Sequence, residues 1–152
     1  LPIFYGCYTR EEIFTLVGRQ TEEKRMSGSV SGVFNLPEYD ATLLFVTLNK
    51  SDKDFSPSTQ YDDYVINKDY FHWQSKNTDS HHNRGGRIYT EQPQRHNKIV
   101  LFVREEKKDG FGNTCPFHCF GLVNYVSSHG DFPMNITWKL EKPVMPQYLK
   151  VV

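Results

Sequence analysis

The sequence has few cysteines, no long hydrophobic run and no excess of charge of either sign. Its three cysteines, Cys7, Cys115 and Cys119, are too few to staple a secreted fold, so we expect a reducing, cytoplasmic environment. The longest apolar runs, residues 43–46 and 99–103, fall far short of the roughly 18 residues that a membrane span needs. The 18 Lys and Arg balance 18 Asp and Glu, so a site for a polyanion must be a local patch.

Several nucleotide-binding and catalytic motifs are also missing. The sequence contains no Gly-x-x-x-x-Gly-Lys-Ser/Thr, no Gly-x-Gly-x-x-Gly and no Gly-x-Ser-x-Gly, the usual signatures of nucleotide hydrolysis, dinucleotide binding and the hydrolase elbow. His96 and Lys98 begin a phospholipase-D-type His-x-Lys motif, but Val103 stands where that motif requires Asp. We therefore expect binding rather than catalysis, with no cofactor.

The length and composition predict one globular domain over residues 1–152. A chain that is 38% hydrophobic and 14% aromatic is too apolar for a disordered tail, and a domain of this length can bury roughly 68–70% of its unfolded surface. Because the chain starts at Leu1 with no basic leader, we interpret it as a module of a longer polypeptide.

The periodicity predicts a mainly β protein with one short N-terminal helix. Thr9 and Glu12 have capping-box spacing, and Gly18 follows the apolar helical positions as a stop. From Val33 onward, β-branched and aromatic runs separated by turn residues predict seven strands. These are residues 33–36, 42–48, 64–67, 70–75, 98–104, 117–125 and 135–140. Seven such segments suggest an antiparallel barrel or a sandwich.

Turn residues and polar stretches predict the connections. Asp109-Gly110 lies between the segments 99–104 and 117–125, so we expect those two strands to pair antiparallel. Two polar connections are long, residues 49–60 and 76–97. Structureless connections of that length in a compact domain are usually functional or mobile, and the second has the richer chemistry.

The segment from His72 to Lys98 is the clearest basic concentration in the chain, with five Lys and Arg against two acids. Guanidinium groups meet phosphates, amides read base edges and rings stack on bases. The mixture therefore predicts a nucleic-acid-binding surface. Its candidate residues are His72, Trp73, Gln74, Ser75, Lys76, Asn77, Arg84, Arg87 and Tyr89.

The same segment also has a plainer interpretation. A polar loop with a few arginines is ordinarily a solvated surface, and Trp73 is more often a core ring than a stacking platform. An aromatic pocket of His72, Trp73 and Tyr89 would suit a flipped base. Gly85-Gly86 would let the backbone approach a ligand closely, although most such pairs are turns.

A zinc site is a further alternative. Cys115, His118 and Cys119 place three possible ligands within five residues. A structural zinc needs a fourth ligand, and on a strand His118 and Cys119 would point to opposite faces. We therefore assign no metal.

A metal-dependent nuclease is the other catalytic alternative. Glu105 and Lys107 follow a predicted strand in the order that restriction-type nucleases use to place a cation and a water against a phosphate. Asp79 or Glu91 would be the upstream acid. The same short triplet is also typical of a charged hairpin tip.

An ordered series of motifs resembles a known family. The series spans about residues 8 to 142 and comprises Thr59-x-Tyr61-x-Asp63-Tyr64, Phe71-His72-Trp73-Gln74-Ser75-x-Asn77, Leu101-Phe102-Val103-Arg104-Glu105, Gly121-x-Val123-Asn124-Tyr125-Val126 and Pro133-Met134-Asn135-Ile136-x-Trp138-x-Leu140. In these motifs the chain resembles the uncharacterised C-terminal domain of large bacterial proteins that carry a phospholipase-D-type nuclease and a superfamily-two helicase.

This resemblance implies a restriction-like defence machine, in which other parts of the same polypeptide cut and translocate DNA while this domain selects it. By analogy, the fold would be a pseudobarrel of the restriction-effector and plant auxin-response-factor DNA-binding type, with the 72–98 segment in the major groove of duplex DNA. No catalytic residue carries over. The remaining alternative is a scaffold that docks on the helicase part or on a partner protein through Phe111, Phe117 or Tyr148.

Overall fold

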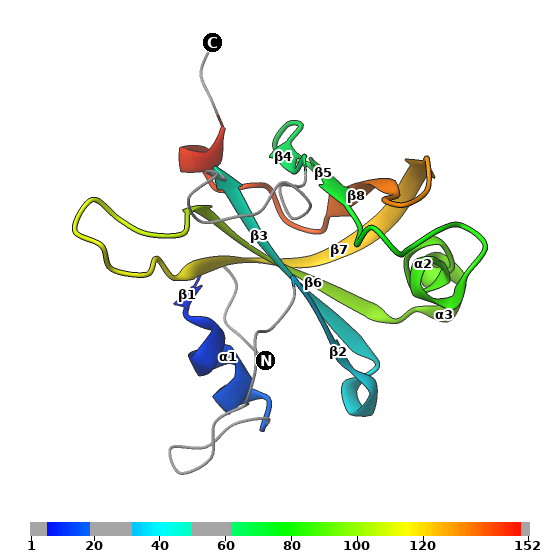
Figure 1. Cartoon of the computed structure of the whole chain (residues 1–152), viewed down its shortest axis with the longest axis horizontal. Coiled ribbons are helices and arrows are strands. Elements are labelled where there is room, and N and C mark those ends of the chain that lie inside the picture. The colour runs from blue at the N-terminus through cyan, green and yellow to red at the C-terminus, as the bar shows by residue number, and fades with distance from the viewer. Residues whose placement is uncertain (1–5, 19–31, 50–61, 150–152) are drawn as a thin grey trace.

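The computed structural model describes residues 6–18, 32–49 and 62–149, so only Asn49 of the predicted 49–60 connection falls within it. These residues form one β-sheet with a few short helices (Figure 1). The strands are β1 (Cys7–Tyr8), β2 (Val33–Leu36), β3 (Ala41–Asn49), β4 (Tyr64–Val65), β5 (Tyr70–Gln74), β6 (Lys98–Glu106), β7 (Phe117–His129) and β8 (Asn135–Leu140). The helices are α1 (Arg10–Leu16), α2 (Arg84–Thr90) and α3 (Gln92–Arg95), with 3-10 turns η1 (Pro37–Tyr39) and η3 (Pro146–Tyr148).

The strand order confirms a mainly β, pseudobarrel-like fold. The order is β2-β3-β6-β7-β8-β5-β4, and β1 pairs with the beginning of β7. As predicted, β6 and β7 are antiparallel. Two details differ from a simple antiparallel barrel. Strands β3 and β6 pair in parallel, with Leu44 opposite Leu101, and the sheet is open, with β2 and β4 at its ends. The long connection between β3 and β6 permits the parallel crossover.

The N-terminal helix begins as predicted. The Thr9 side chain accepts a hydrogen bond from the Glu12 amide at 3.1 Å, and the Glu12 carboxylate accepts one from the Thr9 amide at 3.0 Å. Gly18 follows the helix with φ 77°, a conformation that glycine adopts without strain. None of the helices in the described ranges is long and apolar enough to cross a membrane.

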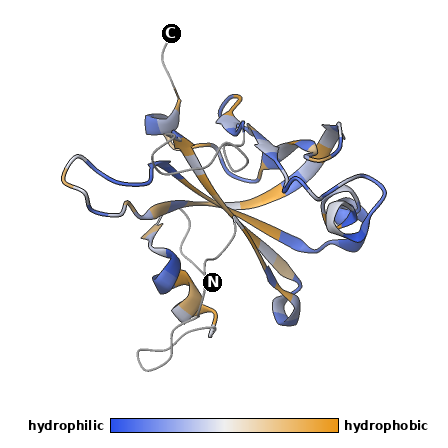
Figure 2. Cartoon of the chain, viewed as in Figure 1, coloured by the Kyte–Doolittle hydropathy of each residue, from blue (hydrophilic) through white to orange (hydrophobic). Residues whose placement is uncertain are grey.

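Strands β3 and β6 are buried on both faces. Leu44 and Leu101 belong to one core with Trp138, whereas Phe45 and Phe102 belong to a second core that α1 covers. The Phe45 and Phe102 rings stack with their centroids 5.2 Å apart. Figure 2 shows the hydrophobic residues gathered where β3, β6 and β7 cross. Burial of both faces explains the continuous apolar runs in these two strands.

Strand β7 changes partners along its length. Its first residues pair with β1 and β6, and its last residues pair with β8. The register with β6 shifts between Leu101 and Phe102, next to Gly121 at φ 84°. Such a bulge bends and twists a strand. The bend carries β7 from the β6–β7 hairpin at one end of the molecule to α2 and α3 at the other (Figure 1).

The segment 76–97, which the sequence predicts as a structureless connection, instead contains two short helices. The Asn83 side chain caps α2 by accepting a hydrogen bond from the Gly86 amide at 3.0 Å. Gly86, Tyr89 and Gln92 are buried and recur at helical spacing. A Cβ at Gly86 would overlap the carbonyl oxygen of Ser80. The close backbone approach allowed by this glycine is therefore internal to the fold.

Replacing Gly86 by alanine should lower the free energy of unfolding by about 1–3 kcal/mol, because the added methyl group overpacks the contact with Ser80. Gly110→Ala is the matched control, since a Cβ at Gly110 meets nothing within 4 Å. Urea unfolding followed by circular dichroism measures both variants. Equal stability of the two variants would contradict this description of α2.

Candidate nucleic-acid interface

The loop after β5 and the loop between β7 and β8 form one surface. We define the paired-loop surface as residues 76–87 together with residues 128–133. Its base is fixed to the sheet by Ser75 and Met134. The Ser75 amide donates to the Met134 carbonyl at 3.0 Å, and the Met134 amide donates to the Ser75 hydroxyl at 2.9 Å. Both residues are fully buried, so the two loops begin from rigid backbone.

Further hydrogen bonds join the two loops directly. The Phe132 amide donates to the Asp79 carbonyl at 3.0 Å. The His81 amide and ring Nδ1 contact the Asp131 carboxylate at 2.7 and 2.8 Å, and the ring Nε2 lies 2.6 Å from the Ser128 hydroxyl. The side-chain and backbone hydrogen bonds from His81 lower the pKa of Asp131. The paired-loop surface is thus pre-organised rather than a pair of independent loops.

Three of the predicted cations are exposed on or beside α2. Arg84 and Arg87 are exposed and lie on one helix face at i, i+3 spacing, and Lys76 is exposed in the preceding loop. In the part of the chain that the structure describes, Arg84 and Arg87 form no ion pair. Arg95, by contrast, is paired with Glu91, its Nε lying 2.9 Å from the carboxylate. Among the residues described, Arg84 and Arg87 therefore place two unpaired positive charges on α2.

The predicted aromatic candidates do not form a ligand pocket. Trp73 and Tyr89 are 4% and 1% exposed. Their rings pack edge to face on each other with the centroids 5.0 Å apart, and both lie against Trp138 in the core, at 6.2 and 6.0 Å. His72 is the neighbour of Trp73 on β5, so it points to the opposite face. There its ring stacks on Tyr64 with the centroids 4.5 Å apart. These three rings therefore do not form the pocket for a flipped base that the sequence left open.

The amide and hydroxyl candidates on β5 are already engaged. The Gln74 side chain accepts from the Asp62 amide at 2.6 Å and donates to Asn135 at 3.0 Å. The Ser75 hydroxyl is held by Met134. Contact with base edges would require these bonds to break. The predicted site residues that remain exposed are Lys76, Asn77, Arg84 and Arg87.

A buried carboxylate lies beneath this surface. Asp79 is 3% exposed, and within the described residues its Oδ2 atom has no hydrogen-bond partner. Burial raises the pKa of Asp79, while the charge and the backbone amide of Lys76 act in the opposite direction. Burial, and then the charge of Asp79, raise the pKa of Tyr89. The charge of Asp79 thus disfavours the ionised form of Tyr89.

One exposed aromatic residue at this surface is absent from the sequence predictions. Phe132 is 62% exposed and adopts φ 56°. It belongs to the turn Gly130-Asp131-Phe132-Pro133, whose last residue begins the last family motif. The turn composition marks the loop, but only the fold places it beside α2.

The acidic residues that a metal-dependent nuclease would need lie at opposite ends of β6. Glu91 comes just before α3 and the start of β6, and Phe132 holds Asp79 at that same end. Glu105 lies at the other end of the strand, and seven residues of strand from Lys98 span about 23 Å. The restriction-type arrangement of Glu105 with Asp79 or Glu91 is therefore not assembled.

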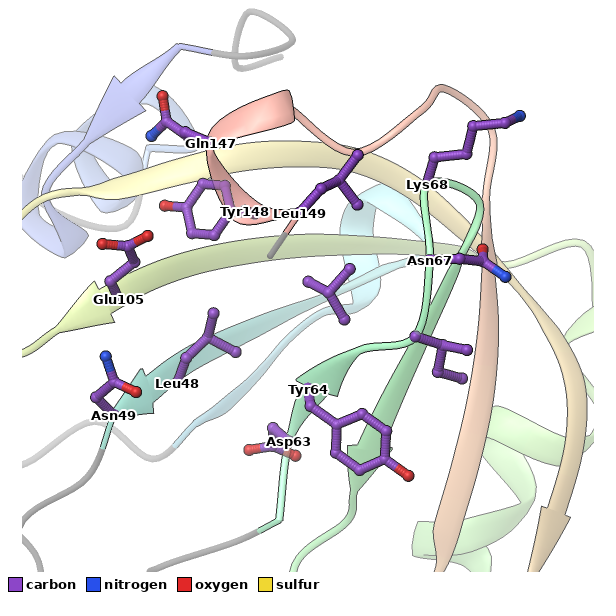
Figure 3. Close-up of a pocket in the computed structure, with 12 residues that line it drawn as sticks. Leu48, Asn49, Asp63, Tyr64, Asn67, Lys68, Glu105, Gln147, Tyr148 and Leu149 are labelled. Carbon is purple, nitrogen blue, oxygen red and sulfur yellow. The ribbon is translucent and has the colours of Figure 1, made fainter. Parts of the chain in front are cut away.

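A cavity lies at the Glu105 end of β6. It has a volume of about 650 Å³ and is lined by the ends of β3 and β6, by β4 and by η3 (Figure 3). Glu105, Tyr148 and Asp63 are among its lining residues. In the described ranges, no three His, Cys, Asp or Glu side chains lie where they could hold a metal ion. Cys115, His118 and Cys119 accordingly do not form such a group.

The comparison with protein families gives a match along nearly the whole chain. A family model described as "Domain of unknown function (DUF3427)" matches residues 3–151. The chain belongs to this DUF3427 family. A search of curated proteins finds no match to the chain. The matched region includes both the paired-loop surface and the β6–β7 hairpin at the opposite end of the domain.

The three residues predicted to dock on a partner protein differ in their exposure to solvent. Phe117 and Tyr148 are 1% and 6% exposed and belong to the two cores, so they present no surface to a partner. Phe111 is 93% exposed at the tip of the β6–β7 hairpin. The Asp109 carboxylate fixes this tip by accepting from the amides of Phe111 and Asn113 at 2.8 and 3.0 Å.

Replacing Asp79 by asparagine should raise the melting temperature at pH 7.5 by a few degrees. The folded-state pKa of Asp79 lies above its unfolded value, so the native carboxylate destabilises the fold above both pKa values. That cost disappears as the pH falls below the unfolded value of about 3.9. The difference between variant and wild type should therefore shrink as the pH falls toward 4.

Asp109→Asn is the matched control, because hydrogen bonds from the amides of Asn113 and Phe111 lower the pKa of Asp109. This variant should not be stabilised at pH 7.5. Thermal unfolding at several pH values measures both variants. An Asp79→Asn protein less stable than the wild type at pH 7.5 would contradict the assignment of a buried, poorly compensated carboxylate.

Proposed function

We propose that this DUF3427 domain is a DNA-recognition module and that the paired-loop surface is its contact region. The observation that carries the proposal is the gathering of Lys76, Arg84 and Arg87 on hydrogen-bonded loops at one end of a chain whose formal net charge is zero. Guanidinium and ammonium groups on such a surface suit phosphate oxygens. Asn77 is exposed beside them and is a residue type that reads base edges.

The rigidity of the two loops favours binding. Hydrogen bonds from His81 and Phe132 hold the loops together, so less conformational entropy is lost when a ligand is bound. Three cations contact few phosphates, and each phosphate contact contributes a slope of about −0.9 to the dependence of log K on log salt for duplex DNA. We therefore expect modest affinity and a salt slope no steeper than about −3.

The proposed biological role follows from the motif resemblance. In that role the domain selects DNA for a nuclease and a superfamily-two helicase in the same polypeptide, as part of a restriction-like defence protein. DNA and these parts of the polypeptide are its proposed partners. A cytoplasmic setting with reduced cysteines fits this role, and it remains a prediction.

A second candidate function is docking on another protein. The β6–β7 hairpin favours it, because Phe111 is 93% exposed on a tip held by the Asp109 carboxylate and by the bond from the Cys115 amide to the Lys107 carbonyl at 2.9 Å. This hairpin lies at the end opposite α2 (Figure 1). Docking there and DNA contact at the paired-loop surface are therefore compatible.

The double variant Arg84→Ala, Arg87→Ala should bind duplex DNA more weakly and with a salt slope shallower by about two, because each lost phosphate contact removes roughly one unit. Lys107→Ala, Lys108→Ala is the charge-matched control at the opposite end of the molecule. Fluorescence anisotropy with a labelled duplex at several salt concentrations measures all three proteins.

The control should keep the wild-type affinity and slope. Equal slopes for the wild type and for the Arg84, Arg87 double variant would refute the proposed contact region. No DNA binding by the wild type at low salt, combined with capture of the helicase part through Phe111, would favour the docking function instead.

A further inference from the structure

Phe132 is exposed in an unfavourable backbone conformation. Its side chain is 62% exposed and its φ is 56°, a region that bulky residues rarely adopt and that glycine or asparagine would occupy with less strain. Strained residues of this kind are concentrated at functional sites. Packing does not account for the ring either, because Phe132 belongs to neither hydrophobic core.

The surrounding contacts hold Phe132 in this position. Its amide donates to the Asp79 carbonyl at 3.0 Å, and the preceding residue, Asp131, accepts both hydrogen bonds from His81. Two residues later, Met134 is bonded to Ser75 in the buried base of the loop. The ring is therefore presented by a fixed loop rather than by a mobile one.

The segment bonded to Phe132 carries exposed cations as well as the carboxylate of Asp79. Asp79, its hydrogen-bond partner, is in electrostatic contact with Lys76, and its carboxylate oxygen lies so close to Gly85 that it would overlap a Cβ there. Gly85 directly follows Arg84 in α2. The loop that carries the exposed ring is thus bonded to the segment that carries the exposed cations. Aromatic rings on cationic surfaces bind single-stranded nucleic acid by stacking on bases.

We propose that Phe132 stacks on the face of an unpaired base, so that the domain prefers DNA containing unpaired bases to fully paired duplex. This inference rests on the proposed DNA-binding function and specifies its ligand. The ring would act as a stacking platform, while Lys76 and Arg84 would contact the adjacent phosphates.

The small number of cations decides between an unpaired base and a wedge inserted into duplex DNA. Proteins that insert an apolar side chain between paired bases unstack and bend a stiff duplex, and they repay that cost with many additional contacts. This surface offers few phosphate contacts, because its exposed Lys and Arg side chains are Lys76, Arg84 and Arg87. An already unpaired base carries little of the unstacking cost.

The test compares two labelled DNA molecules of the same sequence, one fully paired and one with a central unpaired bubble that contains 2-aminopurine. Wild type should bind the bubble more tightly and quench its 2-aminopurine fluorescence. Phe132→Ala should lose about 5- to 100-fold in affinity for the bubble and much less for the duplex. Phe132→Trp should restore binding and quenching, whereas Phe132→Leu should restore neither.

Phe111→Ala is the matched control, because it removes an even more exposed phenylalanine at the opposite end of the chain, and it should behave as wild type. Circular dichroism confirms that each variant is folded. Equal losses for bubble and duplex in Phe132→Ala, or rescue by Phe132→Leu, would overturn stacking on an unpaired base while leaving DNA binding intact. Failure of wild type to bind either DNA would overturn the inference together with the proposed function.

Discussion

Burial of β6 on both faces is the constraint on which the rest of the structure depends. Ile99, Leu101 and Val103 face one core, and Val100 and Phe102 face the other. Neither face can carry a polar functional group without the cost of burying it unpaired. Solvent-accessible chemistry is therefore confined to the ends of the strand. The two ends differ in kind, because one has a cavity and a hairpin tip, and the other has the paired-loop surface with its exposed cations.

The paired-loop surface exposes three cations at one end of a domain whose formal net charge is zero. Arg95 is neutralised by Glu91, and Asp79 is buried beneath the surface instead of lying among the exposed cations. Glu91 is thus used in an ion pair with Arg95, and Asp79 is buried at a cost to stability. Arg84 and Arg87 remain exposed to solvent. Phe132 lies on the same surface but belongs to the loop between β7 and β8. Its ring is exposed, whereas the rings of Trp73 and Tyr89 in the basic segment are buried in the core. The DUF3427 family model matches residues 3–151 and so includes all of these elements.

Local signals predicted the local structure. The capping box of Thr9 and Glu12 and the β-branched and aromatic run over residues 135–140 were sufficient to predict α1 and β8, because both patterns depend on neighbours in sequence. The parallel pairing of β3 with β6 was not predictable, since no local pattern specifies which buried strands meet. The sequence did not predict the helix α2, because one of its buried positions is Gly86. Glycine has no apolar side chain, so the helical spacing of buried residues is not visible as a hydrophobic pattern. Gln74 and Ser75 were predicted to be available, but residues about 60 positions away engage them. The fold therefore buries or engages five of the nine candidate residues, and it exposes Phe132 on the neighbouring loop.

The most direct test of the central claim is a map of amide hydrogen exchange for the whole chain with and without an oligonucleotide that contains an unpaired bubble. If the paired-loop surface recognises DNA, peptides covering residues 76–87 and 128–133 will exchange more slowly in the complex, and the hairpin around Phe111 will not change. Protection confined to the hairpin or to the Glu105 cavity, or no protection anywhere under conditions of saturating DNA, would contradict the account.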